Sequence, residues 1–444
     1  MTTRRAAHDT PEDVTPGKRA EHRRSSGPGA RHGHPVDGPP IVLKFGGSAF
    51  SELEGFHRVA QYAARRLADE RRPLVLIVSA MSGTTGRLQQ TLDALVDDPP
   101  ADTAAMLLTT GETVSVALLA AALNAEGVPA HPLQAAGTGF VAEGPSDRAC
   151  LVAASAESLT AALADCPVVV VPGGQAVDAA GRTVMLGRNS SDLSAVAAAA
   201  ALGAETCELF SDVPGVCTAD PYLVPAARVL DRIDYESLRR MSRYGAKVVH
   251  ESAVDWAERG GVRLLCRPFP WSESAGEGTE VGTGPGAAAA VVVLQNSDVW
   301  CFRSAHQRGA AAEQLRGEGL VVTEFDTAGT ACLTVPAGAR GSTDHLRTAH
   351  RMDGICLVTA LGWDSGAEHS VVPRAEAAEE ARRYHAELYP RTGGDAPREA
   401  ATPVFKARSA HSDVLVGIRR REPQHPDARG EQATRADGGN VCPQ

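Results

Sequence analysis

Three runs of consecutive apolar residues, each followed by small residues or glycines, constrain the fold more than any other feature of the sequence. They read IVLKFGG at 41–47, PLVLIVSA at 73–80 and CPVVVVPGG at 166–174. Continuous rather than alternating apolar residues indicate strands that are covered on both faces. Segments with helical periodicity, at 57–72 and 101–127, separate the runs. This order predicts an α/β fold, with a mainly parallel sheet between two helical layers.

Ligands of such sheets bind at the carboxyl ends of the strands. The exits at 44–47, 79–85 and 172–174 all follow predicted strands, so they are expected to converge on one ligand. A glycine pair lets backbone N–H groups approach a phosphate, and the ammonium group of Lys44 would neutralise its oxygens. Taken alone, the segment favours a tight turn that leaves Lys44 in solvent, because short Gly-rich motifs recur by chance.

Charge and cysteine usage narrow the class of protein. The 444 residues include 44 Lys and Arg against 54 Asp and Glu, a formal charge of −10, which argues against a nucleic-acid partner. Nine cysteines are scattered without CxxC or Cys/His ligand spacing, so neither a metal site nor a disulfide framework is predicted. No uninterrupted apolar stretch reaches 18 residues. We expect a cytoplasmic protein that has small-molecule partners and no membrane contact.

Composition also predicts domain boundaries. Residues 1–38 contain few large apolar side chains and are expected to form a disordered tail, as are residues 421–444. A Gly/Ala/Glu-rich stretch at 272–290 indicates a division between a domain at 39–283 and a smaller α+β region at 284–420.

Short strands and helices are predicted within the second region. The strands are expected at 289–295, 299–303, 320–326, 331–335, 355–362, 403–408 and 413–419, and the helices at 308–319, 342–350 and 374–389.

Six motifs occur together, in one order, between residues 41 and 283. They are KFGGS, VSAMSGTTGRL, TTGETVSVALLAAALNAEGVPA, GRNSSD, FSDVPGVCTADP and YGAKVVH. In sequence and order they resemble aspartate kinases of the amino acid kinase superfamily. The resemblance implies the three-layer αβα fold of that family, followed by ACT-like regulatory units of βαββαβ topology. It also implies a homo-oligomer that uses ATP, with Mg²⁺ as the ATP complex, to convert L-aspartate to 4-phospho-L-aspartate, and an amino-acid effector.

The resemblance assigns roles to individual residues. Lys44 would contact the transferring phosphate, and Asp192 would orient Lys44. The residues implied to bind the amino acid are Thr85, Glu112, Arg188 and Ser191. Those implied to bind the nucleotide are Gly46, Gly47, Ser48, Ser211, Asp212, Asp220 and Lys247. Because a carboxylate is already ionised at neutral pH, its attack on phosphorus needs no general base.

Each assignment has a structural alternative. Asp192 and Glu112 begin helical patterns, where a carboxylate favours the helix dipole whatever its chemistry. Arg188 and Lys247 could be solvated, and Thr85 could simply complete a turn. Their joint occurrence with Lys44 favours the functional interpretation.

The chain also departs from the family pattern. Asn189 and Ser190 stand where aspartate kinases usually have two glycines, and Cys217 and Tyr222 stand where a tyrosine and an arginine are usual. Two alternatives to an aspartate kinase therefore remain open: a kinase of another small acid in specialised metabolism, and a catalytically weak, kinase-like regulatory protein.

Overall fold

The computed structural model describes residues 38–187, 189–246, 248–270, 278–284, 288–318, 320–327, 329–337, 346–362 and 366–390, all within one compact unit. Arg188 and Lys247 lie outside the described residues. So do almost all of the predicted N-terminal tail, the predicted strands at 403–408 and 413–419, and the predicted tail at 421–444.

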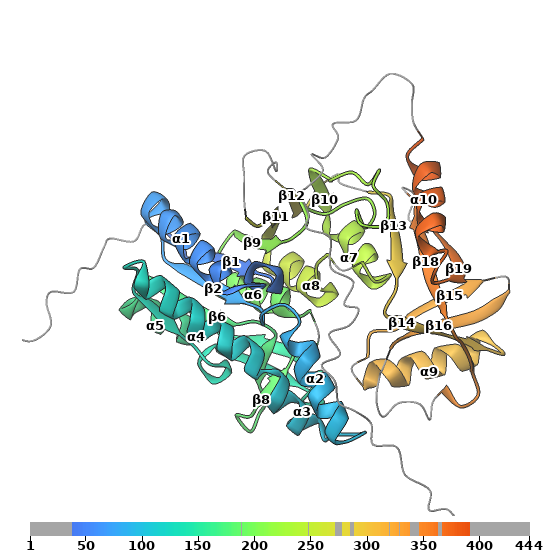
Figure 1. Cartoon of the computed structure of the whole chain (residues 1–444), viewed down its shortest axis with the longest axis horizontal. Coiled ribbons are helices and arrows are strands. Elements are labelled where there is room, and N and C mark those ends of the chain that lie inside the picture. The colour runs from blue at the N-terminus through green and yellow to red at the C-terminus, as the bar shows by residue number, and fades with distance from the viewer. Residues whose placement is uncertain are drawn as a thin grey trace, which may run out of the picture. The chain divides into compact units, whose positions relative to one another are not determined.

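An eight-stranded sheet forms the centre of the fold (Figure 1). In spatial order its strands are β10 (Arg232–Asp234), β12 (Thr279–Gly282), β11 (Arg263–Pro268), β9 (Thr206–Ser211), β1 (Ile41–Phe45), β2 (Leu74–Val78), β6 (Val168–Pro172) and β3 (Ala130–Pro132). Every neighbouring pair is parallel except β11 with β12. The predicted, mainly parallel sheet is confirmed.

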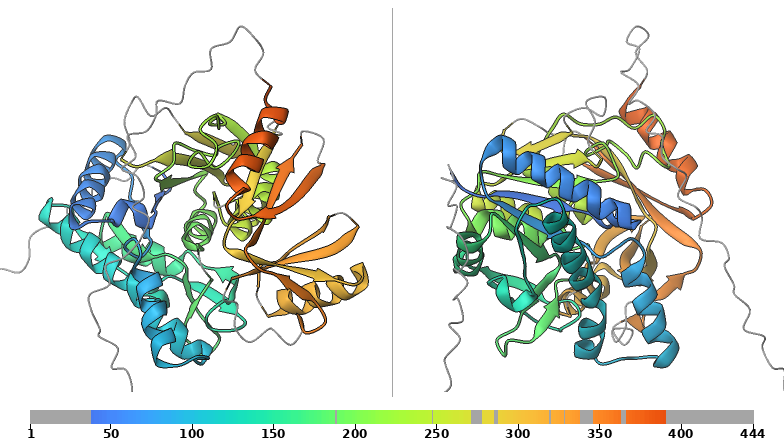
Figure 2. Two further views of the ribbon diagram at one scale, coloured as in Figure 1. Left: turned by 45° about the vertical axis from the view of Figure 1, so that its right-hand side comes forward. Right: turned by 60° about the vertical axis from the view of Figure 1, so that its left-hand side comes forward.

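Helices cover both faces of this sheet, as the continuous apolar runs predicted. Alternate residues of one strand enter two different cores: Val42 belongs to one and Leu43 to the other. The core around Val42 includes residues of α6 (Ser191–Ala201), α7 (Tyr235–Arg243) and α8 (Glu251–Gly260). The core around Leu43 includes residues of α1 (Leu53–Glu70) and α4 (Thr110–Ala125). The result is a three-layer αβα arrangement (Figure 2).

Shorter elements complete this part of the chain. They are the helices α2 (Thr84–Leu95), α3 (Ala101–Leu108) and α5 (Glu157–Asp165), the 3₁₀ turns η1 (Gly47–Phe50) and η2 (Ala135–Gly137), and a second sheet in the order β5 (Cys150–Ala154), β4 (Phe140–Glu143), β7 (Gln175–Val177) and β8 (Thr183–Met185). The segment with helical periodicity at 101–127 forms two helices, α3 and α4, on either side of Thr109.

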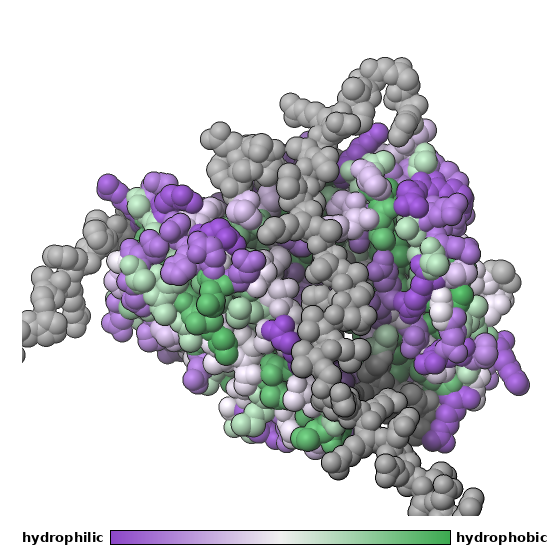
Figure 3. Space-filling view, viewed as in Figure 1, coloured by the Kyte–Doolittle hydropathy of each residue, from purple (hydrophilic) through white to green (hydrophobic). Residues whose placement is uncertain are grey.

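The stretch Ala101–Ala125 is the one helical segment of the described residues that is long and apolar enough to cross a membrane. Within it, Val116, Leu119 and Leu123 of α4 are buried in the core around Leu43. Met106 of α3 is exposed, and hydrophobic residues reach the surface near this helix, whereas hydrophilic residues gather over α1 and α10 (Figure 3). Burial of these three residues indicates that α4 is a core helix.

The C-terminal region is built from two smaller antiparallel sheets. One has the order β13 (Ala290–Leu294), β18 (Ile355–Leu361) and β19 (Ala367–Pro373), with α10 (Ala377–Leu388) packed on it. The other has the order β15 (Thr323–Thr327), β16 (Thr330–Pro336), β14 (Ser297–Phe302) and β17 (His350–Met352), with α9 (Ala305–Gly317). The predicted α+β character is confirmed. The helix predicted at 342–350 is wrong at its end, because His350 pairs in a strand with Cys301.

The two regions have separate sheets but share buried residues. Ala290 and Val292 of β13 belong to the same apolar core as Tyr235 of α7. The backbone N–H of Val291 also donates a 2.8 Å hydrogen bond to the carbonyl oxygen of Thr218. The boundary predicted between residues 283 and 284 therefore stays a prediction, and any division there would cut through a common core.

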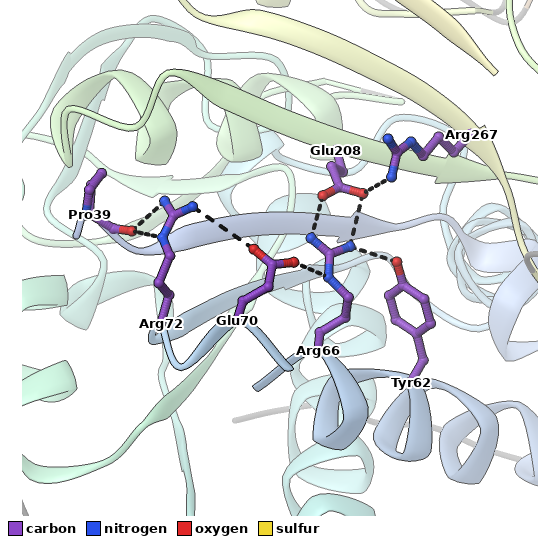
Figure 4. A network of polar contacts seen from close by, with 7 residues as sticks. All are labelled: Pro39, Tyr62, Arg66, Glu70, Arg72, Glu208 and Arg267. Atoms are coloured by element: carbon purple, nitrogen blue, oxygen red, sulfur yellow. Dashed lines mark hydrogen bonds and ion pairs between the residues drawn. The ribbon is translucent and has the colours of Figure 1, made fainter. Parts of the chain in front are cut away.

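A buried carboxylate ties α1 to the central sheet (Figure 4). Glu208 of β9 is 4% exposed, and its Oε1 lies 2.7 Å from Nη2 of Arg66. Arg267 of β11 reaches its other oxygen at 2.8 Å, and Arg66 also donates to the hydroxyl of Tyr62 at 2.7 Å. Two guanidinium groups thus satisfy the buried charge. This network joins α1 to β9, the neighbour of β1, and to β11, the strand beyond it.

Candidate active site

Lys44 lies at the carboxyl end of β1, where the strand order of the central sheet diverges. From β1 the sheet continues through β2 and β6 on one side and through β9 and β11 on the other. Such a switch point leaves a crevice at the strand ends in which ligands bind. Nζ of Lys44 is 2.7 Å from Oδ1 of Asp192, and the two side chains are only 13% and 10% exposed. The ion pair predicted from the sequence is therefore formed at the expected edge of the sheet.

Asp192 is held by the first turn of α6. A carboxylate at this position is stabilised by the positive end of the helix dipole, so the structural alternative for Asp192 also applies. The helix dipole does not explain why Lys44 reaches the same carboxylate from a neighbouring strand. The ion pair thus holds the Asp192 carboxylate and the Lys44 ammonium group together, whatever the helix dipole contributes.

The glycines after β1 permit close packing of two strand exits. A Cβ atom on Gly47 would lie 2.7 Å from the carbonyl oxygen of Ala80, which follows β2. A Cβ on Gly46 would lie 3.6 Å from Nζ of Lys44. Ser48 follows in η1 and is exposed. The exit of β1 thus places Gly46 and the hydroxyl group of Ser48 beside the Lys44 ammonium.

A cavity of about 170 Å³ lies at the exits of β2 and β6. Its lining residues are Thr85, Gly86, Glu112, Gly173, Gly174, Met185, Gly187, Asn189, Ser190 and Ser191. Three of the residues predicted to bind the amino acid, Thr85, Glu112 and Ser191, are therefore brought together. Ser191 is adjacent in sequence to Asp192, so the cavity opens beside the ion pair.

Glu112 is the acidic group of this cavity. It lies in the first turn of α4, and its carboxylate accepts hydrogen bonds from Nε2 of Gln175 at 3.3 Å and from the backbone N–H of Ala80 at 3.4 Å. Burial raises the pKa of the Glu112 carboxyl above its ordinary value, against the opposing effect of these hydrogen bonds. Within the described part of the chain, Glu112 has no ion pair with a lysine or arginine, so its ionised form suits a ligand that carries an ammonium group.

Gln175 is a functional candidate that the sequence reasoning missed. This residue of β7 is 2% exposed, and its Nε2 also donates a 2.7 Å hydrogen bond to the carbonyl oxygen of Thr109. Gln175 therefore links the Glu112 carboxylate to the backbone of Thr109, the residue that precedes α4. The sequence shows only a polar residue directly after the predicted strand exit at Gly173 and Gly174, and neither its burial nor its contact with Glu112.

The loop before α6 adopts conformations that explain its composition. Gly187 and Asn189 have positive φ angles, 84° and 61°. Among residues with side chains, asparagine tolerates this region best, so Asn189 can stand where the family usually has glycine. Ser190 donates a 2.7 Å hydrogen bond from its hydroxyl to the carbonyl oxygen of Gly187. The two departures from the family pattern thus form an ordered turn at the cavity wall.

The predicted nucleotide residues are placed in two groups. Ser211 ends β9 and Asp212 follows it, next to the exit of β1, where the N–H of Gly46 donates to the carbonyl oxygen of Phe210 at 3.1 Å. Asp220 lies farther along the chain in an exposed turn, where its carboxylate accepts from the N–H of Tyr222 at 2.9 Å. Ser211 and Asp212 therefore lie next to the strand exit that carries Lys44, and none of these three residues lines the cavity.

The segment after Asp212 leads to the C-terminal region. Thr218 shares a 2.8 Å hydrogen bond with Nε2 of His385 on α10, and its hydroxyl oxygen accepts from the N–H of Arg228 at 2.9 Å. Burial raises the pKa of Cys217 to about 11, so this thiol stays protonated at neutral pH.

Among the residues that the structure describes, no group of three His, Cys, Asp or Glu side chains could hold a metal ion.

Sequence comparison matches residues 39–267 to the Amino acid kinase family. An aspartokinase of Thermus thermophilus is 39% identical over 227 residues, which are 51% of this chain and 56% of that protein. An aspartokinase of Bacillus sp. strain MGA3 is 38% identical over 230 residues, 51% of this chain and 55% of that protein. The chain thus spans about half the length of the curated relatives it matches.

Solved structures share the fold. Escherichia coli aspartokinase III in complex with aspartate and ADP superposes with a TM-score of 0.61 at 19% identity, over 79% of this chain and 99% of that chain. The aspartate kinase of Clostridium acetobutylicum gives a TM-score of 0.54 at 16% identity, over 78% and 100%. The family match covers more than half of the sequence and includes the Lys44–Asp192 pair. This protein belongs to the amino acid kinase family.

Proposed function

We propose that the protein transfers the γ-phosphoryl group of ATP to the side-chain carboxylate of an amino acid, and that this amino acid is L-aspartate. The product would be 4-phospho-L-aspartate. The observation that carries the proposal is the 2.7 Å pair of Lys44 and Asp192 beside a cavity that contains Glu112. Similarity to aspartokinases over half of the chain supports the choice of aspartate.

The proposed chemistry depends on charge neutralisation. Negative charge is spread over the oxygens of a transferring phosphoryl group, and a fixed cation next to it lowers the barrier. Lys44 is the cation at the strand exit, and Asp192 keeps its ammonium group in one position. The attacking carboxylate is ionised at neutral pH, so no general base is needed, and positioning of the two substrates together with charge neutralisation would suffice.

The cavity residues would bind the amino acid. Glu112 would pair with the α-ammonium group, while the hydroxyl groups of Thr85 and Ser191 would donate or accept hydrogen bonds. Arg188 would pair with a substrate carboxylate through two N–H groups, which lysine could not do. That assignment for Arg188 rests on its sequence motif.

ATP would bind along the exits of β1 and β9. The proposed contacts are Gly46, Gly47 and Ser48, together with Ser211, Asp212, Asp220 and Lys247. The proximity of β9 to β1 supports the first five, and the motifs alone support Asp220 and Lys247. Mg²⁺ would arrive with ATP and neutralise its phosphate oxygens, and Asp212 is the described carboxylate at this strand exit that suits a hard cation.

The C-terminal region would bind an amino-acid effector. The sheet order β15-β16-β14-β17 and the element order β14, α9, β15, β16, β17 support an ACT-like unit. We further propose a cytoplasmic homo-oligomer that acts in amino-acid biosynthesis.

A substrate panel tests the proposal. The full chain is incubated with ATP, Mg²⁺ and either aspartate, glutamate or another small acid, while ADP release is coupled to NADH oxidation and hydroxylamine traps the acyl phosphate. We expect ADP and hydroxamate to form with aspartate. Turnover with a different acid alone would favour the kinase of another small acid. ADP formation with none of them would favour the kinase-like regulatory protein.

A further inference from the structure

Two cysteines face each other across neighbouring strands of the sheet formed by β14–β17. Cys301 of β14 and Cys332 of β16 are direct partners in the antiparallel register, and their Sγ atoms are 3.1 Å apart. Opposed residues of antiparallel strands have Cα atoms about 4.5–5.5 Å apart. Disulfides bridge Cα atoms that are about 4.4–6.8 Å apart. A bond between these two sulfurs therefore needs side-chain adjustment but no strand rearrangement.

A third sulfur extends the pair. Sδ of Met352 on β17 lies 3.3 Å from Sγ of Cys301. Because β14 lies between β16 and β17, the three sulfurs come from three adjacent strands. The apolar side chains of Val299 and Phe325 belong to the same cluster. The Cys301 and Cys332 thiols thus contact each other, and Cys301 also contacts the sulfur of Met352. This arrangement allows the two thiols to react with each other.

The two thiols differ in accessibility. Cys301 is partly exposed, whereas Cys332 is fully buried. Burial, followed by the hydrogen bond with Cys301, raises the pKa of the Cys332 thiol to about 12. A small oxidant in solution would therefore meet Cys301 first, and Cys332 would act as the second, resolving thiol.

We propose that Cys301 and Cys332 form a dithiol modification site that hydrogen peroxide converts to an intramolecular disulfide. The Cys301 thiolate attacks one peroxide oxygen and breaks the O–O bond, which gives a sulfenic acid and, after proton uptake, water. The sulfur of Cys332 then attacks the sulfenic sulfur and loses its proton, while the S–O bond breaks and a second water leaves. Two thiols and one peroxide thus give one disulfide and two waters. A soluble dithiol reverses the reaction.

This site is separate from the proposed phosphotransfer centre. Its residues come from the C-terminal region, and none of them lines the cavity that contains Glu112. In a reducing compartment such a disulfide would be transient, as is typical of redox-responsive pairs.

Peptide mapping of the full chain tests the proposal directly. The protein is treated with hydrogen peroxide, its remaining thiols are alkylated, and it is digested with trypsin without reduction. Arg303, Arg308 and Arg316 lie between the two cysteines, so trypsin releases them on separate peptides. Because trypsin does not cleave before a proline, the bond after Arg267 stays intact and the first of these peptides spans 264–303.

We expect a cross-linked species of peptides 264–303 and 317–340 that is two hydrogen masses lighter than their sum and disappears after treatment with dithiothreitol. Fragmentation of this species in the mass spectrometer should assign the bond to Cys301 and not to Cys266, which the first peptide also contains. Separate peptides, at a peroxide dose that oxidises the exposed Cys150, would overturn the proposal.

Variants provide the matched control. Cys301→Ser should abolish the cross-link and leave Cys332 open to alkylation after unfolding. Cys150→Ser should leave the cross-link unchanged. Thermal melting of each variant checks its fold, and the mapping of the parent chain stands without them. Loss of the Cys332 thiol in Cys301→Ser at the parental rate would contradict the role of Cys301 as the first thiol to react.

Discussion

At the scale of single residues, the cavity combines one carboxylate with several neutral polar groups. Glu112 is held by Gln175 and by the N–H of Ala80, and no arginine or lysine is recorded in contact with it among the described residues. Burial raises its pKa because the charged form is poorly solvated there. The described residues therefore leave the charge of Glu112 incompletely neutralised, at the position proposed to bind an amino acid's ammonium group.

This environment predicts how substrate binding depends on pH. Because the pKa of Glu112 is raised, its carboxylate takes up a proton at a higher pH than an ordinary glutamate during acidification. We expect the KM for aspartate to rise as the pH is lowered from about 8 towards 5, while the KM for ATP changes less. Initial rates at a series of pH values measure both.

Glu112→Gln is the diagnostic variant. It keeps the shape of the side chain but cannot ionise, so the KM for aspartate should be raised at every pH and should lose the part of its pH dependence that Glu112 supplies. Glu126→Gln, at an exposed position, is the matched control. A parental pH profile in Glu112→Gln would show that the ammonium group is bound elsewhere.

At the scale of elements, the site depends on a close contact between the exit of β6 and the start of α6. A Cβ atom on Gly173 would lie 2.6 Å from Cβ of Ser191, and one on Gly174 would lie 2.8 Å from Oγ of Ser190. Ser79, after β2, donates or accepts a 2.9 Å hydrogen bond with the hydroxyl of Ser191. Two strand exits thus fix the N-terminal turn of α6, and with it the position of Asp192.

Gly173→Ala should displace this turn. We expect activity to fall at least about tenfold, because a Cβ cannot fit at 2.6 Å and Asp192 must move with α6. Gly309→Ala, within α9 where no atom lies within 4 Å of the added carbon, should leave activity unchanged. Steady-state kinetics and thermal melting of both variants make the comparison. Parental kinetics in Gly173→Ala would mean that this contact does not position Asp192.

At the scale of the whole described unit, the larger core continues from the central sheet into β13 of the C-terminal region. Val292 of β13 lies in the same cluster as Leu238 of α7, and Leu361 of β18 belongs to it as well. Segments on both sides of the predicted boundary at residue 284 therefore stabilise each other. Removing the C-terminal region would uncover part of this core.

A pair of valine variants tests this shared core. Val292 is 3% exposed and Val321 is 59% exposed. Val292→Ala should lower the free energy of unfolding by about 1–3 kcal/mol, whereas Val321→Ala should change it by less than about 0.5 kcal/mol. Chemical denaturation followed by circular dichroism measures both. If unfolding showed two separate transitions and Val292→Ala shifted only the one assigned to the C-terminal region, the core would not be shared.

The sequence predicted the central sheet well because its strands are buried on both faces and leave an unbroken apolar pattern. It also predicted that Lys44, Glu112 and Asp192 would lie at strand or helix ends. Gln175 was missed because its partner Glu112 is 63 positions away in the chain, a distance that a local pattern cannot bridge. The path of the segment that carries Asp220 depends on packing against β13, for which the motif gave no signal.

Some assignments remain predictions from the sequence. Arg188 and Lys247 lie outside the described residues, so only their motifs support their roles. The shared core across residue 284 could not be predicted either, because the Gly/Ala/Glu-rich composition at 272–290 resembles that of a linker. The composition of a segment indicates the conformation that the segment itself prefers. It does not show whether the residues on either side of the segment share a buried core.

The central claim is that Lys44 stabilises the phosphoryl group as it moves to aspartate. The most direct test measures aspartyl hydroxamate formed from ATP and aspartate by the parent chain, by Lys44→Ala and by Arg65→Ala, a change at an exposed cation of α1. Loss of a transition-state contact of this kind lowers the rate about a hundred- to thousandfold. We predict that fall for Lys44→Ala, with a parental rate for Arg65→Ala and cooperative melting for both variants. Hydroxamate formation by a folded Lys44→Ala at the parental rate would contradict the account.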